Sequence, residues 1–287
     1  MILWLARFLF HSVPPGQFSM QMEQSSMNDR LVYYFGRSGC DGSLSDKHLL
    51  GGKGANLAEM TRIGVPVPPG FTITTAVCLA YLRGEGHPPG LDATVKAALR
   101  RLEAETGKTF GGGSDPLLVS VRSGAAASMP GMMDTILNLG LNDDTAAALA
   151  RRTGNERFAL DSYRRFVQMY GEVVLGLDSK RFEEELEARK RERGVEQDTD
   201  LDVADLRDIV ARFKGLVERQ TGEPFPEDPM EQLRGAIDAV FDSWNNERAI
   251  HYRRVNGIAD DLGTAVSVVT MVYGNMGDDS GTGVAFT

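Results

Sequence analysis

The sequence has few of the residues that form disulfides or bind metal ions. Its 287 residues include only two cysteines and four histidines. Cys40 and Cys78 fit no metal-site or disulfide spacing, which indicates a reducing compartment, and the histidines form no ligand cluster. We therefore expect no metal ligands within this chain.

Positive charge and long apolar runs are also scarce. Lysine and arginine number 31 against 40 acidic residues, a formal net charge of −9, which argues against nonspecific binding to nucleic acid. The apolar run over residues 1–10 is too short to span a bilayer, so we expect no membrane association. Residues 1–30 resemble either a targeting segment or a poorly ordered extension upstream of a later start, and we favour the extension.

The chain is organised around the stretch from Leu118 to Asp134. It begins as an apolar, β-branched run, which predicts a buried strand, and Arg122 follows at the expected strand end. An arginine held there would offer a preorganised fork for phosphate oxygens, and the small residues after it would let a ligand approach the backbone. The same pattern also fits an arginine that closes an ion pair at a strand end.

A second stretch places Lys53 among three glycines, directly before a helical pattern expected from about Ala55 to Arg62. Glycine-rich turns at helix N-termini expose N–H groups to anions, and a lysine adds a mobile positive charge. The spacing is not that of a Walker A motif. An ordinary loop before a helix is the plainer interpretation of this stretch.

A third stretch, residues 273–283, is rich in glycine and lies between two β-rich runs, 265–272 and 284–287. It predicts a hairpin with a long tip. That tip is either an ordinary loop or a flap whose N–H groups close over phosphates.

The remaining patterns predict an α/β (α+β) fold. Val32–Gly36 and 71–75 are expected strands, 76–83 is an expected short helix, and a helical apolar spacing from Leu91 to Leu102 predicts an amphipathic helix. Residues 142–227 are expected to form a helical subdomain, in which 180–193 is a solvated helix and Arg164 and Arg165 are surface charges. Asp228 followed by Pro229 predicts another helix start, and 247–255 a further helix.

Several segments together resemble the nucleotide-binding domain of the pyruvate, phosphate dikinase family. They are LLGGKGANLAEM with GVPVPPGFTITT, then DPLLVSVRSGAAASMPGMMDTILNLGLN, FALDSYRRFVQMYGEVV and TMVYGNMGDDSGTGVAFT. The resemblance covers about residues 31–287. Its most specific part surrounds Arg122, since the related phosphoenolpyruvate synthases share the lysine loop and the VRS core but continue with a different run.

The resemblance implies an ATP-grasp-like domain. Its α/β subdomain would comprise 31–141 and 228–272, with the helical subdomain 142–227 inserted, and 273–287 would begin a second subdomain that the sequence leaves incomplete. Lys53 and Arg122 match catalytic residues that contact the ATP phosphates. The cofactor-binding residues expected by resemblance are Gly52, Lys53, Arg122, Gly131, Met271, Tyr273, Ser280, Gly281, Thr282 and Gly283. Val269 occupies a position where many members carry glutamine.

The resemblance also implies a reaction for the parent enzyme, a phosphotransferase with paired acceptors. ATP, phosphate and pyruvate would give AMP, diphosphate and phosphoenolpyruvate through a phosphohistidine. No histidine here has a suitable context, so we expect that residue on a separate central domain and pyruvate on a C-terminal barrel. We expect Mg²⁺ ligands beyond Thr287, a cytoplasmic and homodimeric parent enzyme, and no activity of this chain alone. The alternatives are a stand-alone ATP-binding or regulatory module and a fragment of a phosphoenolpyruvate synthase.

Overall fold

The computed structural model describes residues 30–277 and 279–283. The chain divides into two compact units, Met1–Leu31 and Val32–Thr287. Arg30 and Leu31 are the described residues of the first unit, so the prediction of a poorly ordered extension falls almost wholly outside the described part. The helices and strands of the described residues all belong to the second unit.

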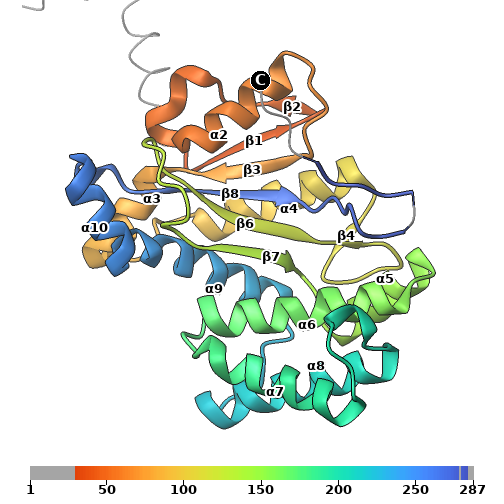
Figure 1. Ribbon diagram of the computed structural model, residues 1–287. Helices are drawn as coiled ribbons and strands as arrows, with labels where there is room; N and C mark the ends of the chain where they lie inside the picture. Colours follow the sequence, from red (N-terminus) through yellow and green to blue (C-terminus); the bar gives the residue numbers. More distant parts are fainter. Residues whose placement is uncertain (1–29, 278, 284–287) are drawn as a thin grey trace, which may run out of the picture. The chain divides into compact units, whose positions relative to one another are not determined.

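The second unit is built on a six-stranded sheet in the order β2-β1-β3-β8-β6-β7. All five neighbouring pairs are antiparallel. Strand β8, from the C-terminal part of the chain, lies between β3 and β6 (Figure 1). The strands of this sheet are β1 (Val32–Gly36), β2 (Gly39–Cys40), β3 (Gly70–Ile73), β6 (Val119–Gly124), β7 (Thr135–Leu139) and β8 (Ala265–Thr270).

Helices make up most of the remaining structure. They are α2 (Lys47–Arg62), α3 (Thr75–Ala80), α4 (Leu91–Thr106), α5 (Asp143–Thr153), α6 (Glu156–Val173), α7 (Ser179–Arg193), α8 (Val203–Thr221), α9 (Pro229–Asp242) and α10 (Glu247–Asn256). Short turns are η1 (Leu44–Asp46), η2 (Tyr81–Glu85), η3 (Asp198–Asp200), η4 (Ser243–Asn245) and η5 (Asp260–Leu262), and β4 (Thr109–Phe110) pairs with β5 (Pro116–Leu117). Together the elements confirm a mixed fold of helices and sheet.

Helices α2 and α4 cover opposite faces of the sheet. Tyr33 packs with Leu50 and with Ala55 of α2, whereas the hydroxyl of Tyr34, the next residue on β1, donates to Glu105 of α4. Successive side chains on a strand point to opposite faces, so the two helices lie on opposite sides. The α4 helix follows the predicted spacing, and its residues from Leu91 to Leu102 at that spacing are buried.

Between residues 142 and 227 the regular elements of the structure are helical, as expected. The predicted apolar stripes of α6 and α8 form the core of this region. Phe166 and Phe213 are fully buried, and Phe213 stacks edge-on against Phe182 of α7 at 5.1 Å. The α7 helix is therefore not a purely solvated face, because Phe182 anchors it to α8.

The prediction that Arg164 is a surface charge is wrong. Arg164 is only 3% exposed and pairs with Asp161 at 2.9 Å and Asp198 at 2.7 Å, whereas Arg165 is exposed as expected. Arg164 lies on the face of α6 that other helices cover, and two carboxylates compensate its desolvation. Lys190 of α7 is buried for the same reason and also pairs with Asp198.

The predicted helix start at Asp228 is confirmed. Its carboxylate accepts a hydrogen bond from the Glu231 N–H at 2.8 Å, and Pro229 occupies the first turn of α9. The expected helix over 247–255 is present as α10. Among the described residues, no helix combines the length and apolar character needed to cross a membrane.

The predicted glycine hairpin stays a prediction, because its second strand lies outside the described residues. Described residues from 271 to 283 form no strand, and Ser280 donates its N–H to the carbonyl of Gly277 at 3.0 Å in a turn. The second predicted strand, 284–287, lies outside the described residues.

Candidate functional site

The plainer interpretation predicted that the lysine stretch is a loop before a helix. In the structure it forms a kink inside helix α2. Helix α2 begins at Lys47, and Gly51 interrupts it with φ 66° and ψ 174°. The helix resumes at Gly52, whose N–H donates to the carbonyl of Ala125 at 2.9 Å. Glycine is needed at the kink because L side chains rarely adopt this conformation. The kink places Lys53 in the first turn of the resumed helix, against the end of β6.

Arg122 lies within β6 and not at its end. The strand continues to Gly124, and Arg122 pairs with Ser267 of β8 and Thr135 of β7. The pairing extends because small residues follow the arginine and the Gly124 N–H donates to the Thr264 hydroxyl at 3.1 Å. Because Arg122 pairs with a strand on each side, its backbone is held more firmly than it would be at a strand end.

The side chain of Arg122 is exposed, and its Nε donates to the Ser120 hydroxyl two residues earlier at 3.1 Å. Across residues 30–277 and 279–283, no carboxylate forms an ion pair with Arg122 or with Lys53. The alternative of an arginine that closes a structural ion pair is therefore wrong for the described part of the chain.

Lys53 and Arg122 converge on one place. A Cβ built on Gly124 would lie 3.5 Å from the Cβ of Lys53, so the lysine is directly beside the strand that carries Arg122. Burial, and secondly the positive charge of Arg122, lower the pKa of Lys53. Two like charges held together without an acidic partner form a site suited to an anion.

We expect Arg122→Met to raise the pKa of Lys53, because the substitution removes the neighbouring positive charge that now disfavours the ammonium. The pKa can be followed by NMR titration of the lysine side chain. As a control, Arg62→Met at the last turn of α2 removes the same charge from a more distant position. An equal pKa in the wild type and Arg122→Met would contradict the convergence.

Gly131 lies in the loop that joins β6 to β7. The connection runs over residues 125–134: Ala125, at its start, accepts the Gly52 N–H, and its second half is the Met129–Asp134 loop, in which Gly131 is exposed with φ 71°. Its underside is apolar: Met129 is buried with Trp244 and Ala249. A Cβ built on Gly131 would meet no atom within 4 Å, so the residue borders open space.

Met271 and Tyr273 lie at the other end of β6. The Met271 N–H donates to the carbonyl of Leu118 at 2.9 Å, and the Tyr273 hydroxyl donates to Asn138 Oδ1 at 3.2 Å. Burial raises the pKa of Tyr273, whose ring packs edge-on against Phe158 at 5.0 Å. Both residues line a pocket of about 600 Å³, with Pro116, Leu118, Leu149, Thr153, Thr270, Val272, Met276, Gly277 and Asp279 and with the charged Lys108, Asp115 and Arg152.

The predicted flap residues are not brought to the two cations. A Cβ on Gly274 would lie 1.7 Å from the Thr282 hydroxyl, so the glycine segment (residues 273–283) folds back on itself. Within the described part of that segment, no hydrogen bond or ion pair joins Ser280, Gly281, Thr282 or Gly283 to Lys53 or Arg122. The structure thus brings the lysine and arginine stretches together, and the part of the third stretch that it describes forms no polar contact with either cation.

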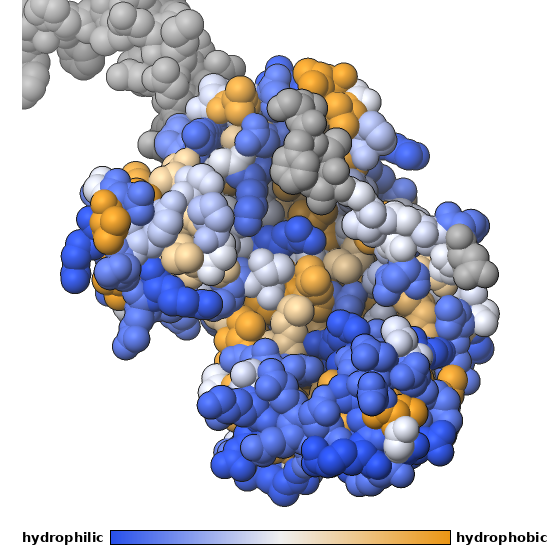
Figure 2. Space-filling view, in the orientation of Figure 1, coloured by the Kyte–Doolittle hydropathy of each residue, from blue (hydrophilic) through white to orange (hydrophobic). Residues whose placement is uncertain are grey.

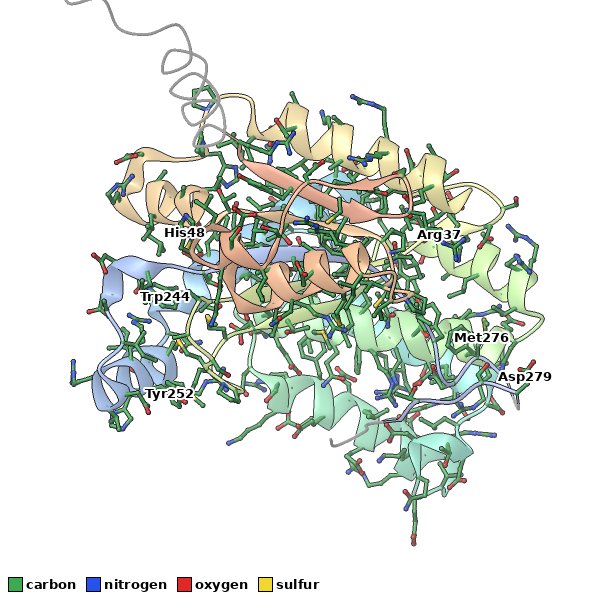
Figure 3. The ribbon with its side chains drawn as sticks, turned by 90° about the horizontal axis from the view of Figure 1, so that it is seen from above. Arg37, His48, Trp244, Tyr252, Met276 and Asp279 are labelled. Carbon is green, nitrogen blue, oxygen red and sulfur yellow. The ribbon has the colours of Figure 1, made fainter. Side chains whose placement is uncertain are left out.

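The surface above these strands is hollowed. Figure 2 shows a recess with apolar patches, bounded by α10 on the left and by the helices of residues 142–227 below. Seen from above, Met276 and Asp279 lie at one end of the molecule and Trp244 and Tyr252 at the other (Figure 3). The sites singled out from the sequence thus spread along the strands between these ends.

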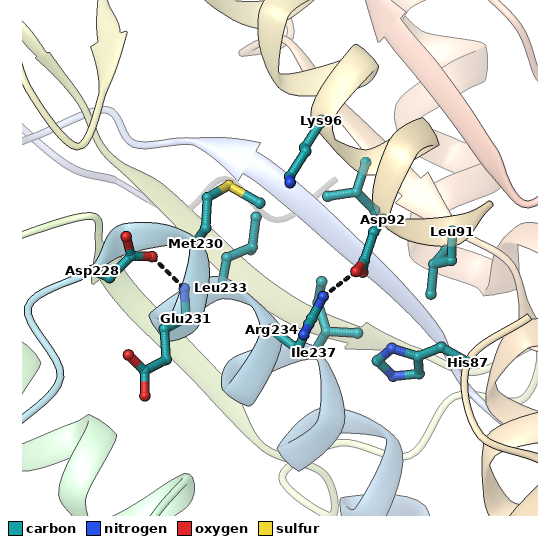
Figure 4. A pocket seen from close by; sticks show the side chains of 11 residues that line it. His87, Leu91, Asp92, Lys96, Asp228, Met230, Glu231, Leu233, Arg234 and Ile237 are labelled. Carbon is teal, nitrogen blue, oxygen red and sulfur yellow. Dashed lines mark hydrogen bonds and ion pairs between the residues drawn. The ribbon is translucent and has the colours of Figure 1, made fainter. Parts of the chain in front are cut away.

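A second pocket, of about 270 Å³, lies between α4 and α9 (Figure 4). It combines apolar side chains such as Leu91 and Leu233 with an ion pair between Asp92 and Arg234. His87 borders it and approaches Asp238 at 2.6 Å. None of the binding or catalytic residues predicted from the sequence lines this pocket, so it is not the predicted site.

Sequence reasoning missed two polar residues that support the site, Ser120 and Asn138. Asn138 adopts φ 60° next to the irregularity in the β6–β7 pairing, and its side chain receives the Tyr273 hydroxyl. Asparagine tolerates this conformation better than most residues, which is the only signal the sequence carries. No group of three or more metal-binding side chains is present in the described residues.

Comparison with known proteins gives a consistent result. The family model described as "Pyruvate phosphate dikinase, AMP/ATP-binding domain" matches residues 47–105 and 86–287. The chain is 56% identical over 259 residues to pyruvate, phosphate dikinase of Rhizobium meliloti (strain 1021), which is 90% of this chain and 29% of that protein. It is 55% identical over 249 residues to pyruvate, phosphate dikinase of Clostridium symbiosum, covering 86% of the chain and 28% of that protein.

A plant relative agrees with the bacterial ones. Identity to pyruvate, phosphate dikinase 2 of Zea mays is 54% over 261 residues, which is 91% of this chain and 29% of that protein. The chain thus spans less than a third of the length of the curated relatives that it matches. The family model covers most of the chain, including both the kinked helix with Lys53 and the strand with Arg122. The chain therefore belongs to the family of pyruvate, phosphate dikinase AMP/ATP-binding domains.

Proposed function

We propose that this chain binds ATP along β6 and β8, with the phosphates at Lys53 and Arg122 and the adenine near Met271 and Tyr273. One observation carries the proposal: two cations meet beside β6 with no carboxylate partner among the described residues. Such an arrangement costs stability unless an anion completes it, and phosphate oxygens fit both an ammonium and a guanidinium.

The order of residues along the strands supports an elongated ligand. In the antiparallel register, Val119 faces Thr270 at one end, Arg122 faces Ser267, and Gly124 faces Ala265 at the other end. Met271 and Tyr273 come directly after this strand pair, and Lys53 lies beside Gly124. Five residue steps of about 3.3 Å each separate the two ends, roughly 17 Å. A nucleotide laid along this line would meet the pocket, then Arg122, then Lys53.

The residues fit the demands of phosphoryl transfer. That chemistry needs positioning and charge neutralisation more than covalent participation of the protein. Lys53 and Arg122 would neutralise charge on the β- and γ-phosphates, and more strongly as it redistributes in the transition state. The exposed Gly131 would add a backbone donor to these two cations, whereas the Gly52 N–H is already bonded to the carbonyl of Ala125.

In the longer protein, we assign this chain to the nucleotide-binding part of a pyruvate, phosphate dikinase. ATP, phosphate and pyruvate would give AMP, diphosphate and phosphoenolpyruvate through a phosphohistidine on another domain. The proposal includes an ATP-grasp arrangement with 142–227 as the inserted helical subdomain, and closure of Ser280–Gly283 over the phosphates. The described residues hold no cluster suited to Mg²⁺, so we place its ligands elsewhere in the protein and assign it no step here. Homodimer formation and a cytoplasmic location stay predictions.

Calorimetric titration of the chain with ATP tests this proposal. We expect saturable binding that inorganic diphosphate competes for, because the cations should contact the phosphates. Absence of binding at millimolar ATP would contradict it. In a longer protein that contains this chain, Lys53→Ala or Arg122→Ala should abolish the ATP half-reaction and spare exchange between phosphoenolpyruvate and pyruvate. Equal loss of both half-reactions would instead indicate misfolding.

A further inference from the structure

Three asparagines cap helices in the same way. The side-chain Oδ1 of Asn142, Asn155 and Asn246 accepts the N–H three residues on, at 2.8, 3.0 and 2.7 Å, at the starts of α5, α6 and α10. All three side chains are half-buried. Because each Oδ1 is committed to the helix, the orientation of each amide is fixed and its Nδ2 must donate in the other direction.

The Nδ2 groups of the three asparagines donate to carbonyls in different segments. The Nδ2 of Asn246 donates to the carbonyl of Met132 at 3.0 Å, next to Gly131. The Nδ2 of Asn155 donates to the carbonyl of Met276 at 3.2 Å, within the glycine segment. The Nδ2 of Asn142 donates to the carbonyl of Glu227 at 3.1 Å, before α9 and away from both loops. Two of the three caps therefore reach a segment expected to touch ATP.

The hydrogen bonds from Asn155 and Asn246 matter because few other contacts hold the glycine segment and the Met129–Asp134 loop. The Met129–Asp134 loop is held otherwise by its apolar underside, by a hydrogen bond from the Met132 N–H to the Met129 carbonyl at 3.3 Å, and by the half-buried Asp134, which pairs with the exposed Arg248 at 3.4 Å. The glycine segment beyond Tyr273 carries four glycines at 274, 277, 281 and 283, and glycine loses more conformational freedom on ordering than other residues. A fixed donor at one carbonyl removes part of that cost before a ligand arrives.

We propose that Asn155 and Asn246 are positioning residues, which use their helix-capped amides to hold residues 273–277, beside the pocket of about 600 Å³, and the Met129–Asp134 loop in the conformation that binds ATP. The proposal rests on the proposed function. It makes the starts of α6 and α10 the supports of the two ends of the nucleotide site, since α6 and α10 lie on different sides of the strands (Figure 1). Neither asparagine touches the reacting atoms.

Asparagine-to-aspartate substitutions separate the two halves of each amide. In Asn155→Asp and Asn246→Asp the carboxylate still caps the helix, but it cannot donate to the loop carbonyl. Asn155→Ser and Asn246→Ser repeat the test without a charge, because a serine hydroxyl also caps but is too short to span both partners. Asn142→Asp and Asn142→Ser are matched controls with the same cap and the same burial.

Each variant is measured by ATP titration, thermal melting and hydrogen exchange of residues 129–134 and 273–277. We expect unchanged melting temperatures, faster exchange in the loop that each asparagine holds, and ATP binding weakened about 3- to 10-fold by both the Asp and the Ser variants. The Asn142 variants should bind ATP like the wild type. Weakening by the Asp variants alone would show a charge effect, and equal behaviour of all three sites would also overturn the proposal. If the wild type fails to bind ATP, the proposed function fails, while exchange still decides whether the asparagines order their loops.

Discussion

Replacing Lys53 or Arg122 with methionine should weaken ATP binding by about 10- to 100-fold. A hydrogen bond to a charged group contributes roughly 1.5–3 kcal/mol, and 1.4 kcal/mol corresponds to a factor of ten. Each cation should donate to phosphate oxygens, with no competing carboxylate among the described residues. Methionine preserves most of the length of the side chain and favours helix at position 53, so the loss should reflect charge. Titration calorimetry with ATP measures the effect.

The same two variants should melt at the wild-type temperature or slightly above it. Burial and the charge of Arg122 lower the pKa of Lys53, so in the free protein these charges repel and removing one relieves a small cost. Lys96→Met is a suitable control, since it removes a cation from α4, on the opposite side of the sheet from α2. If Lys96→Met weakened ATP binding as strongly as Lys53→Met, the net charge of the protein would explain the effect and the proposed phosphate site would be wrong.

The sequence predicted the helices of the fold better than it predicted the conformation of the glycine-rich stretches. Helical spacing gave α4, α6 and α8 correctly, because a stripe of apolar residues depends only on which side faces the core. The burial of Arg164 was not predicted, since it depends on Asp161 and on Asp198, which is 34 residues away. No local pattern reports a partner at that separation.

The lysine stretch shows why glycine patterns are ambiguous. Three glycines around Lys53 indicated a loop, yet one of them, Gly51, forms a kink and the others remain helical. Packing decides this outcome: α2 lies so close to the end of β6 that its backbone bonds to Ala125. Propensity alone cannot foresee that approach, because the strand end comes from about 70 residues later in the chain.

Gly51→Ala should destabilise the chain strongly. The new Cβ would lie 1.4 Å from the carbonyl oxygen of Gly124, an atom of the backbone that cannot move without disturbing β6, and φ would stay at 66°. Overlap with the backbone and the left-handed conformation together should cost about 3–5 kcal/mol. In a unit of this size that lowers the melting temperature by roughly 10 °C, which thermal unfolding followed by circular dichroism measures.

The neighbouring glycine provides the control. At Gly52 the nearest atom to a new Cβ is the carbonyl oxygen of Ala125 at 3.5 Å, an ordinary contact, and the residue is helical. Gly52→Ala should therefore fold with little loss of stability and keep its N–H bond to Ala125. Equal destabilisation by both substitutions would mean that the two stretches do not meet as described. Because the contact at Gly51 also sets where Lys53 lies, any folded fraction of Gly51→Ala should bind ATP more weakly than Gly52→Ala does.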